Sequence, residues 1–390
     1  MVAASADAPS VDIIRLLLAK GANIDGRDES GFTALDWALL EGETEVAQVL
    51  RAAGAKPMAQ VSHPRPVDAP RTTAAAVEKA VALLQPIGPN FFKAFGGCIS
   101  CHNNSLPGLA ARMAAERKVP VNTALIGHAE KVAMATWSPQ QENLAVGASS
   151  IGGLVANTSY ELFVMAEARY PRNLVTDAAA LALVRLQHSN GTWSITDCRP
   201  PLGISDIKWA ALVSRGLQAY LPSGLSAERD RAIARARLYL TNTPPRTTQD
   251  AAFRLLGLLW TSASPACTQE AKAHLLALQR QDGGWGQLTT MPSDAYATGQ
   301  SLFALQSAGV APSDADYRRG VDYLLRTQLP DGSWFVQSRA VAFQPYNETG
   351  FPHGRSQFIS AASTAWAVMA LAPAIDAPKQ MASSPAILCE

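Results

Sequence analysis

The sequence predicts an all-α fold built from repeated helical hairpins, and three observations lead to this prediction. Ala-rich segments with apolar residues at i, i+3 and i+4 recur along most of the chain. The strict alternation of apolar and polar residues that marks strands is nearly absent. A Gln–turn–Trp motif returns at regular intervals. The segments expected to be helical are 72–85, 105–117, 122–136, 158–169, 174–187, 206–220, 227–240, 249–261, 268–280, 293–308, 314–327 and 360–371.

The repeated turn motif follows the end of a predicted helix in each copy. Its clear copies are LQHSNGTW at 186–193, LQRQDGGW at 278–285 and TQLPDGSW at 327–334, with a weaker copy, LQPIGPNF, at 84–91. The Gln side chain can hydrogen-bond open backbone groups at the helix end, while the aromatic ring packs over the turn. Successive Gln residues are 102, 92 and 49 positions apart, which fits a helical-hairpin repeat of 46–51 residues.

Composition and charge limit the classes of protein that fit. The chain has 390 residues, of which 48% are hydrophobic and 17% charged, enough to bury a large core in two or three domains. A net charge of +1 gives no electrostatic footprint for nucleic acid or an anionic membrane. The sequence contains no apolar run of the ~18 residues that a transmembrane helix needs.

The first 57 residues differ from the rest of the chain. VDIIRLLLAKGANID at 11–25 and the following residues 30–57 resemble ankyrin repeats, with one partial and one whole copy. Because such repeats bury their apolar faces on neighbours, about three are normally needed for stability. We therefore expect either upstream repeats or docking of this segment on the next domain. The segment is expected to bind a protein partner or to act as a packed cap, and a Pro-rich linker follows at 58–70.

The turn motifs and the hairpin period of residues 71–373 resemble the squalene/hopene cyclase and prenyltransferase superfamily. The resemblance implies an α/α toroid, with an inner ring of helices inside an outer ring and an apolar interior suited to isoprenoid chains. Helix 72–85 would close the outer ring, and residues 374–390 are expected to form a frayed tail. Inner helices are expected near 105, 158, 206, 249, 293 and 360, and outer helices near 122, 174, 227, 268 and 314.

A CxxCH motif lies between the first turn motif and the first inner helix. Cys98 and Cys101 have the spacing that forms two thioethers to one porphyrin, and His102 follows as an iron ligand. The motif predicts a covalently attached haem c at a mouth of the ring. The same residues would also suit a zinc half-site, a redox CxxC pair or a chance match. The remaining cysteines form no second pair at zinc-finger spacing: Cys198, Cys267 and Cys389.

The haem interpretation also predicts a location. Haem is attached to such motifs outside the cytoplasm in bacteria, so the protein is expected in the periplasm or otherwise exported. The first residues, MVAASADAPS, have neither the basic region nor the apolar core of a signal peptide. We therefore expect either that the natural N-terminus lies further upstream or that the haem interpretation is wrong.

The loop 337–358 is expected to lie beside the haem, because the sixth inner helix neighbours the first in a closed ring. His353 is the candidate sixth iron ligand, and Arg339 is the candidate partner of a haem propionate. Other side chains compete for the sixth position, although a packed Met or a surface His is the plainer interpretation of each: Met113, His128 and Met134.

The superfamily's cyclising members protonate their substrate with a DxDD motif, which this sequence lacks. It also lacks the DDxxD motif for diphosphate-bound magnesium. Asp206, Asp250 and Asp294 nevertheless begin three consecutive predicted inner helices. They are expected either to cap those helices or to form a carboxylate ring for proton transfer or for a cation. Aromatic residues near the starts of inner helices would line the cavity or form ordinary core: Trp209, Phe253, Tyr296 and Trp366.

Three functions follow from these features. The first is a c-type haem redox protein with an apolar cavity, which oxidises, binds or transfers electrons to an isoprenoid-like hydrophobic molecule. The second is a terpenoid cyclase-like enzyme that uses an acid other than DxDD, with Asp206, Asp250 and Asp294 as candidates. The third is a non-catalytic scaffold that uses the ankyrin and toroid surfaces.

Overall fold

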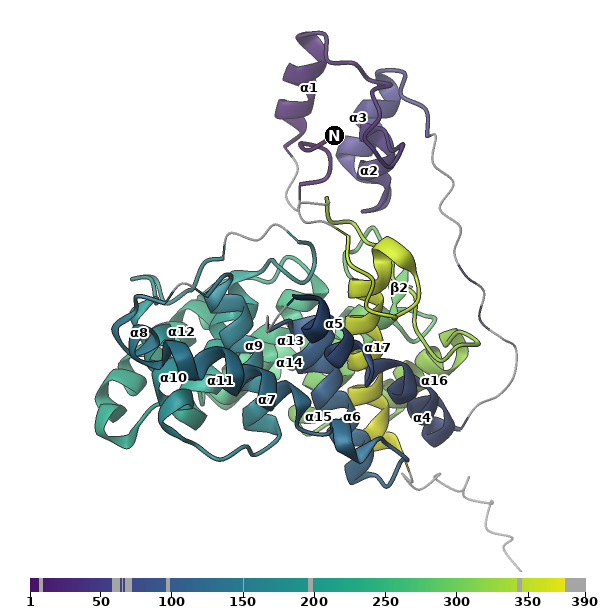
Figure 1. Ribbon diagram of the computed structural model, residues 1–390. Coiled ribbons are helices and arrows are strands. Elements are labelled where there is room, and N and C mark those ends of the chain that lie inside the picture. Colours follow the sequence, from purple (N-terminus) through teal and green to yellow (C-terminus); the bar gives the residue numbers. More distant parts are fainter. Residues whose placement is uncertain are drawn as a thin grey trace, which may run out of the picture.

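The computed structural model describes residues 1–6, 10–57, 72–95, 99–149, 151–195, 199–341 and 346–375, with positions 64 and 66. The predicted linker 58–70 and the predicted tail 374–390 lie almost wholly outside the described residues. The described residues form a small hydrophobic core between Ala4 and Ala55 and a large one between Ala76 and Ile375. Figure 1 shows the small N-terminal segment above a large helical body.

The N-terminal segment contains helices α1 (Val11–Ala19), α2 (Ala34–Leu39) and α3 (Glu45–Ala52). Helix α2 begins with a capping box, in which the side chains of Thr33 and Asp36 each accept from the other residue's backbone N–H. These helices enclose the small core together with Ala4 and Ala55, which lie outside them. The ankyrin-type segment of the predicted fold is therefore confirmed.

An inner ring of helices forms the centre of the large body. Each inner helix packs against the next one, and α17 packs against α6, so the ring is closed. This confirms the α/α toroid. Helix α9 begins before the expected position 158, because Gly153 provides a left-handed residue directly before it. The inner helices are α6 (Leu106–Glu116), α9 (Leu154–Glu167), α11 (Asp206–Tyr220), α13 (Thr248–Trp260), α15 (Ala295–Ser307) and α17 (Gln357–Leu371).

Outer helices cover this ring. Helix α4 packs against both α17 and α6, at the seam between the last and the first inner helix, and Figure 1 shows these three side by side. The prediction that this helix closes the outer ring is therefore confirmed. The outer helices are α4 (Thr73–Leu84), α7 (His128–Trp137), α10 (Leu174–Arg185), α12 (Ser226–Asn242), α14 (Pro265–Ala277) and α16 (Ala315–Thr327).

Smaller elements connect the helices of the two rings. The sequence pattern does not predict helices α5 (Ile87–Phe95) and α8 (Gln141–Val146). The two-residue strands β1 (Trp285–Gly286) and β2 (Ser293–Asp294) pair in antiparallel fashion. A π-helical turn, Cys101–Ser105, leads into α6. Short 3₁₀ turns lie at Thr123–Leu125, Ser138–Gln140, Ser223–Leu225, Gly354–Ser356 and Ala372–Ala374.

The Gln–turn–Trp motifs tie one outer helix to the next. Gln187 Nε2 donates to the carbonyl of Gly191 in its own turn at 3.2 Å and to that of Ala232 on α12 at 2.9 Å. Gln279 and Gln328 make the same pair of bonds. In each copy the Trp indole N–H donates to a carbonyl 10 residues earlier, in the preceding helix. The predicted role of the motif is therefore confirmed.

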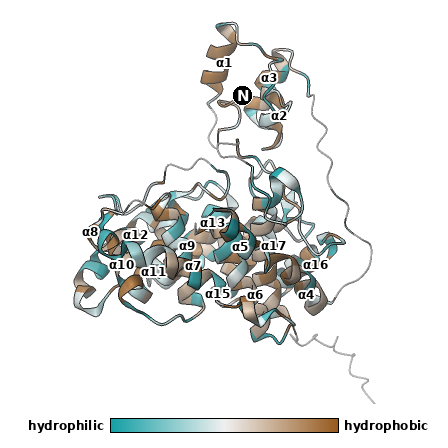
Figure 2. Ribbon diagram, viewed as in Figure 1, coloured by the Kyte–Doolittle hydropathy of each residue, from teal (hydrophilic) through white to brown (hydrophobic). Residues whose placement is uncertain are grey.

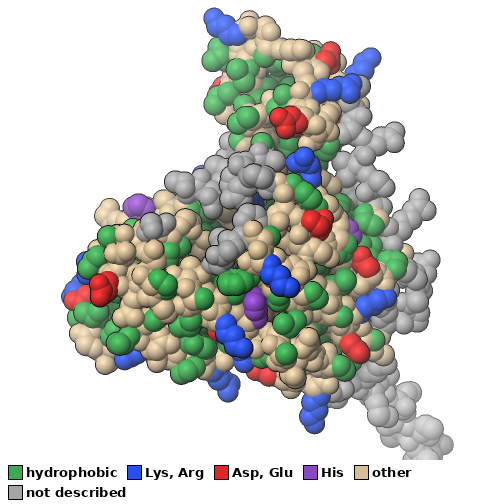
Figure 3. All heavy atoms as spheres, in the orientation of Figure 1, with side chains coloured by type: hydrophobic (Ala, Val, Ile, Leu, Met, Phe, Trp, Pro, Cys, Tyr) green, Lys and Arg blue, Asp and Glu red, His purple; other side chains and the backbone are tan. Residues whose placement is uncertain are grey.

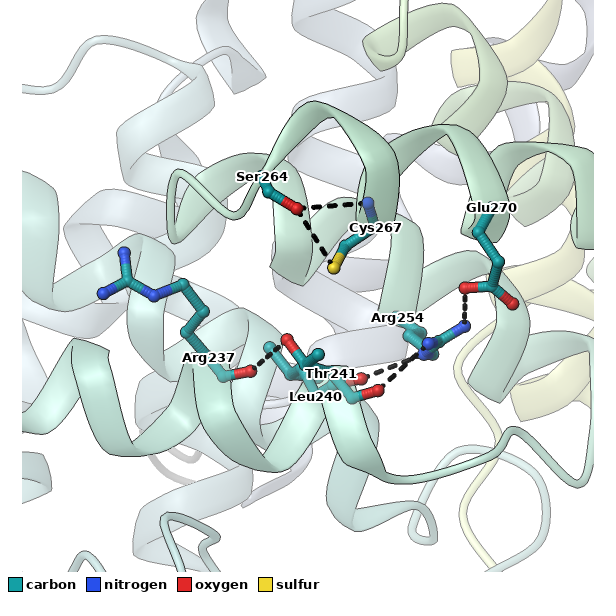
Figure 4. Close-up of polar contacts among 7 residues, drawn as sticks. All are labelled: Arg237, Leu240, Thr241, Arg254, Ser264, Cys267 and Glu270. Atoms are coloured by element: carbon teal, nitrogen blue, oxygen red, sulfur yellow. Dashed lines mark hydrogen bonds and ion pairs between the residues drawn. The ribbon is translucent and has the colours of Figure 1, made fainter.

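A buried arginine joins inner helix α13 to both of its outer neighbours. Arg254 donates to the carbonyls of Leu240 at 2.9 Å and Thr241 at 3.2 Å, both near the end of α12. Its guanidinium also lies 2.8 Å from a carboxylate oxygen of Glu270 on α14 (Figure 4). These contacts hold the hairpins of the ring together where no turn motif follows α12.

Candidate functional site

The first residues of the inner helices lie at one end of the ring, and these helices are α6, α9, α11, α13, α15 and α17. We call this end the N-terminal mouth. Tyr296, at the start of α15, donates its hydroxyl to Gln249 Oε1, at the start of α13, at 2.7 Å. The ring of His102, just before α6, contacts that of Phe358, at the start of α17, with centroids 5.7 Å apart. Candidate residues from separate helices therefore meet at this mouth.

Two of the three predicted aspartates have different surroundings at the mouth. Asp206 is exposed at the first position of α11. Asp250 is buried, and its Oδ2 accepts from the backbone N–H groups of Arg246 and Thr247. Its Oδ1 accepts from the hydroxyl of Ser205. Both oxygens of Asp250 are occupied, and the residue completes a capping box with Thr247, the N-cap of α13.

Asp294 is the N-cap of α15, and burial raises its pKa as it also raises that of Asp206. Its Oδ1 accepts from the N–H of Ala297 at 2.9 Å, and its Oδ2 accepts from Gln287 Nε2 at 3.0 Å. Burial raises the pKa of its carboxyl to about 6, although these two bonds and the Arg339 guanidinium oppose the rise. A share of the Asp294 carboxyl groups therefore carries a proton close to neutral pH.

Aromatic side chains fill the interior of the ring. The ring of Trp366 contacts those of Phe253 and Phe303, with centroids 6.0 and 5.4 Å apart. Trp209, Phe253, Tyr296 and Trp366, which were candidates for a cavity lining, are at most 1% exposed. Because an open cavity would leave exposed area on its lining, Trp209, Phe253 and Trp366 belong to packed core, and Tyr296 borders only a small cavity at the mouth. Around them, the expectation of an open apolar cavity is wrong for this structure.

A small polar cavity of about 10 Å³ lies at the N-terminal mouth. Its walls include Gln249, Tyr296 and Gln300 from inner helices and Gln287 and Arg339 from loops. This volume is roughly that of one water-sized probe. Gln300 Oε1 is buried there without a hydrogen-bond partner.

The described part of the CxxCH motif lies at the same mouth, and Cys98 lies outside the described residues. His102 is buried, and its Nδ1 lies 3.5 Å from Ser100 Oγ and 3.6 Å from Cys101 Sγ. Burial, helped by the Arg199 guanidinium, lowers the pKa of this imidazole to about 3. Burial also raises the pKa of the Cys101 thiol. His102 is therefore neutral near pH 7, the form that can bind iron or zinc.

Two basic side chains that sequence reasoning missed lie close to Cys101 and His102. Lys208 on α11 is 0% exposed, and its Nζ lies 4.1 Å from the centre of the Trp209 ring. Arg199 lies over the aromatic ring that His102 contacts, 5.6 Å from its centroid. The positive charges of both basic residues lower the pKa of the Cys101 thiol against the effect of burial. The available signal for Lys208 was a lysine inside the apolar run IKWAALV.

A buried acid on α9 was also missed. Glu161 Oε2 accepts from the hydroxyl of Ser105, at the end of the π-helical turn, at 2.6 Å. Burial raises the pKa of this carboxyl to about 8, and the negative charge of Glu130 adds to the rise. Both polar atoms of the neighbouring Asn104 side chain are buried without a hydrogen-bond partner. The available signal was an acid inside the apolar run YELFVM.

The structure does not join His353 to His102. His353 Nε2 lies 2.7 Å from Ser333 Oγ, and its ring contacts those of Phe335 and Phe351. Within the described ranges, no hydrogen bond or ring contact links the two histidines. The role of His353 as sixth ligand therefore stays a prediction. The competing candidates are half-buried side chains of α6 and α7: Met113, His128 and Met134.

Arg339 has a protein partner where a propionate was expected. Its Nη1 lies 2.7 Å from Glu41 Oε1 of the ankyrin segment, and its Nε donates to Gln287 Oε1 at 3.1 Å. The carboxylate of the docked ankyrin segment supplies the negative charge that this buried guanidinium needs. The pair with Glu41 was not predictable from the sequence, because the two residues are 298 positions apart. The propionate contact of Arg339 stays a prediction.

Among the described residues, no three His, Cys, Asp or Glu side chains gather in a way that could hold a metal ion. Over the same ranges, none of the helices has the length and apolar character of a membrane span. The described free thiols are those of Cys101 and Cys267.

Two family models match separate parts of the chain. Ankyrin repeats (many copies) match residues 1–51, and the squalene-hopene cyclase C-terminal domain matches residues 251–359. The second match extends from α13 to the start of α17, so it includes Asp294. The CxxCH segment lies outside both matched ranges.

Known relatives match short segments of the chain. A squalene–hopene cyclase from Bradyrhizobium diazoefficiens is 34% identical over 108 residues, which cover 23% of this chain and 15% of the relative. A drimenyl diphosphate synthase from Streptomyces showdoensis is 38% identical over 66 residues, which cover 17% of this chain and 12% of the relative. The chain therefore matches only a small part of the length of these relatives.

Solved structures match over more of the chain at low identity. A protein from Actinoplanes has a TM-score of 0.48 at 16% identity and covers 78% of this chain and 100% of its own. The type II terpene cyclase MstE from Scytonema has a TM-score of 0.44 at 15% identity and covers 78% of this chain and 98% of its own.

Proposed function

We propose that the toroid is a terpenoid cyclase-like enzyme, in which Asp294 protonates a double bond of an isoprenoid-like substrate at the N-terminal mouth. The observation that carries this proposal is the place of the Asp294 carboxyl at the N-terminal mouth, as the N-cap of α15. Burial raises its pKa to about 6, so part of it keeps the proton to be transferred near neutral pH. The match of residues 251–359 to the squalene-hopene cyclase C-terminal domain supports it. The segments shared with a squalene–hopene cyclase and a drimenyl diphosphate synthase support it as well.

The proposed step is a proton transfer followed by proton return. The Asp294 proton forms a new C–H bond with one carbon of the double bond, and the neighbouring carbon becomes a carbocation. The N–H donors of Gln287 and Ala297 stabilise the carboxylate that remains. Faces of the Tyr296 and Trp366 rings can stabilise the cation. A second double bond of the same molecule attacks this carbocation and closes a ring, which moves the positive charge to another carbon. Return of a proton from a carbon adjacent to that charge to the carboxylate forms a double bond, so the net reaction is an isomerisation.

Substrate binding requires a rearrangement of the ring interior. Phe253, Tyr296 and Trp366 are 0% exposed, so an isoprenoid chain must separate these rings as it enters from the mouth. We therefore expect binding to change the fluorescence of the buried Trp209 and Trp366.

The test uses squalene and farnesyl diphosphate as a neutral and a charged isoprenoid probe. We expect the full chain to convert at least one of them into an isomer of the same mass, detected by gas chromatography with mass spectrometry. Asp294→Asn should lower the rate by about 100-fold or more. Asp206→Asn, at an exposed position of the same mouth, should keep most of it. No isomer from either probe, or full activity in Asp294→Asn, would overturn the proposal.

A second candidate function is redox chemistry with haem c attached at Cys98, Cys101 and His102. The observation that favours it is the neutral, buried His102 imidazole beside the Cys101 thiol. Lys208 and Arg199 support this candidate, because their positive charges act on the Cys101 thiol and would suit propionates. Bound there, haem would supply one-electron redox chemistry.

Haem attachment is tested on protein exported to a periplasm that has c-type maturation. We expect haem that survives denaturing electrophoresis, gives a pyridine haemochrome spectrum and is lost in the Cys98→Ala/Cys101→Ala variant. A His353→Ala variant with an unchanged haem spectrum would remove His353 as sixth ligand. Protein without covalent haem after such export would reject this candidate, and with it the proposed periplasmic location.

We also propose that the ankyrin segment binds a protein partner. Apolar residues on the outer side of α1 remain uncovered, with Ile13 51%, Leu16 59% and Leu17 44% exposed. Figure 2 shows α1 as strongly hydrophobic, and Figure 3 shows hydrophobic side chains at the surface of the N-terminal segment. A partner recovered with the wild-type chain should be lost with the Leu16→Ser/Leu17→Ser variant. If this variant still recovers the partner, the partner contacts another surface.

A further inference from the structure

The ankyrin segment docks on the toroid at the N-terminal mouth. Glu41, in the turn after α2, is 4% exposed, and its Oε1 lies 2.7 Å from Nη1 of the 3% exposed Arg339. The Thr290 hydroxyl donates to the backbone carbonyl of Glu41. At the next residue, Gly42, φ is +86° and a Cβ would lie 2.1 Å from the Thr290 carbonyl oxygen. The two backbones therefore approach at a distance that only glycine permits.

A chain of hydrogen bonds continues from this contact to the candidate acid. Arg339 Nε donates to Gln287 Oε1 at 3.1 Å, and Gln287 Nε2 donates to Asp294 Oδ2 at 3.0 Å. The guanidinium thus holds the amide oxygen of Gln287, which turns the amide nitrogen toward Asp294. Asp294 in turn accepts from the N–H of Ala297 at the start of α15.

The first link of this chain depends on a buried charge pair. Removing one partner of such a pair leaves the other charge in a poorly solvated site, which strongly disfavours the original arrangement. Without the Glu41 carboxylate, the Arg339 side chain is expected to turn toward other acceptors. Gln287 would then lose the contact that fixes the orientation of its amide group.

We infer that Glu41 of the ankyrin segment is a positioning residue for Asp294, acting through Arg339 and Gln287. The ankyrin segment thereby completes the acid site of the toroid instead of only resting on it. The catalytic part of this inference rests on the proposed function. The positioning of Asp294 by Glu41 is independent of that function, because it can be measured on the protein without substrate.

Hydrogen–deuterium exchange of the full chain measures the positioning directly. In Glu41→Gln and in Arg339→Gln, exchange in the peptide 292–300, which contains the Ala297 amide, should become about tenfold faster or more. Glu43→Gln is the matched control, because Glu43 lies in the same turn and pairs with the exposed Arg51 inside the ankyrin segment. This control should leave the peptide unchanged. A contact that only docks the segment would change exchange around 33–55 and leave 292–300 protected, which would overturn the inference.

A second variant and a second readout separate the possible failures. If Glu41→Gln releases the ankyrin segment, Glu41→Asp, which keeps the charge, must restore most of the protection of 292–300, and failure to do so rejects the relay. If the chain isomerises a probe, Glu41→Gln should shift the half-maximal rate to lower pH, because loss of the negative Glu41 charge from this mouth lowers the pKa of the Asp294 carboxyl. An unchanged pH profile together with unchanged exchange rejects the inference alone. Faster exchange without any product rejects the proposed function alone.

Discussion

Gln328 Nε2 donates to the carbonyl oxygen of Ala76 at 2.8 Å, although 252 residues separate the two in the chain. The same amide group donates to the carbonyl of Gly332 in its own turn, also at 2.8 Å. The last turn motif therefore binds α4, the helix that closes the outer ring, and joins the two ends of the toroid.

Replacing Gln328 should weaken this closure. Gln328→Ala leaves two buried carbonyl groups without their donor, so we expect the free energy of unfolding to fall by about 2–3 kcal/mol. Gln85→Ala is the matched control, because Gln85 makes its bonds to Asn122 at an exposed position, and it should cost less than about 1 kcal/mol. Urea denaturation followed by far-UV circular dichroism measures both, and equal losses would contradict the role given to Gln328.

The glycine of the second turn motif should tolerate no side chain. Gly283 has a φ of +87°, and a Cβ there would lie 2.4 Å from the carbonyl oxygen of Arg319 on α16. We expect Gly283→Ala to lower the free energy of unfolding by about 3 kcal/mol or more. Gly309→Ala has a similar φ of +83° but open space around it, and should cost about 1 kcal/mol. If thermal denaturation shows the same loss of stability for both variants, backbone strain and not the steric clash determines the cost at Gly283.

The buried Glu161 should make the protein less stable as the pH rises. Its pKa is raised from 4.5 to about 8 in the folded chain, so the stabilisation is complete below pH 4.5 and is lost as the pH rises through 8. Glu161→Gln keeps the shape without the charge. We expect this variant to gain several kcal/mol over the wild type between pH 5 and about 8. Urea midpoints at the two pH values measure the difference, and Glu167→Gln, in a partly exposed ion pair with Arg215, should show no such gain.

The buried His102 should act in the opposite direction. Its pKa is lowered from 6.5 to about 3, so its contribution to stability is present above pH 6.5 and is lost as the pH falls through 3. We expect the wild type to lose several kcal/mol relative to His102→Gln over this range. His274→Gln, at an exposed position of α14, is the control and should follow the wild type. Parallel acid-denaturation curves for wild type and His102→Gln would show that the imidazole is solvated in the folded protein.

Much of the fold could be predicted from local patterns. Apolar spacing located the helices, because each helix buries one face. The turn motifs located the ends of hairpins, because the Trp bond and one of the two Gln bonds in each motif join groups at most 10 residues apart. Their regular spacing indicated a helical-hairpin repeat, and the family resemblance implied a closed ring in which α4 occupies the predicted outer position. The helix starts that were misplaced, such as that of α9, depend on a single left-handed glycine that periodicity does not detect.

The candidate site could be predicted only as a set of residue types. The sequence by itself determined that Asp206, Asp250 and Asp294 stand near the starts of inner helices and that His102 follows Cys101. Only the tertiary structure decided that Asp250 is fully bonded, that Asp206 is exposed and that Asp294 keeps a raised pKa.

The same distinction holds for the ring interior and for the ankyrin contact. Composition indicated aromatic residues on inner helices, while packing decided that they fill the centre instead of lining an open cavity. The sequence contained Arg339 and Glu41, and docking made them a buried pair across 298 positions. Helices and turns depend on contacts between residues that are close in the sequence. Burial, charge pairing and pKa follow from residues that meet only when the ring has closed.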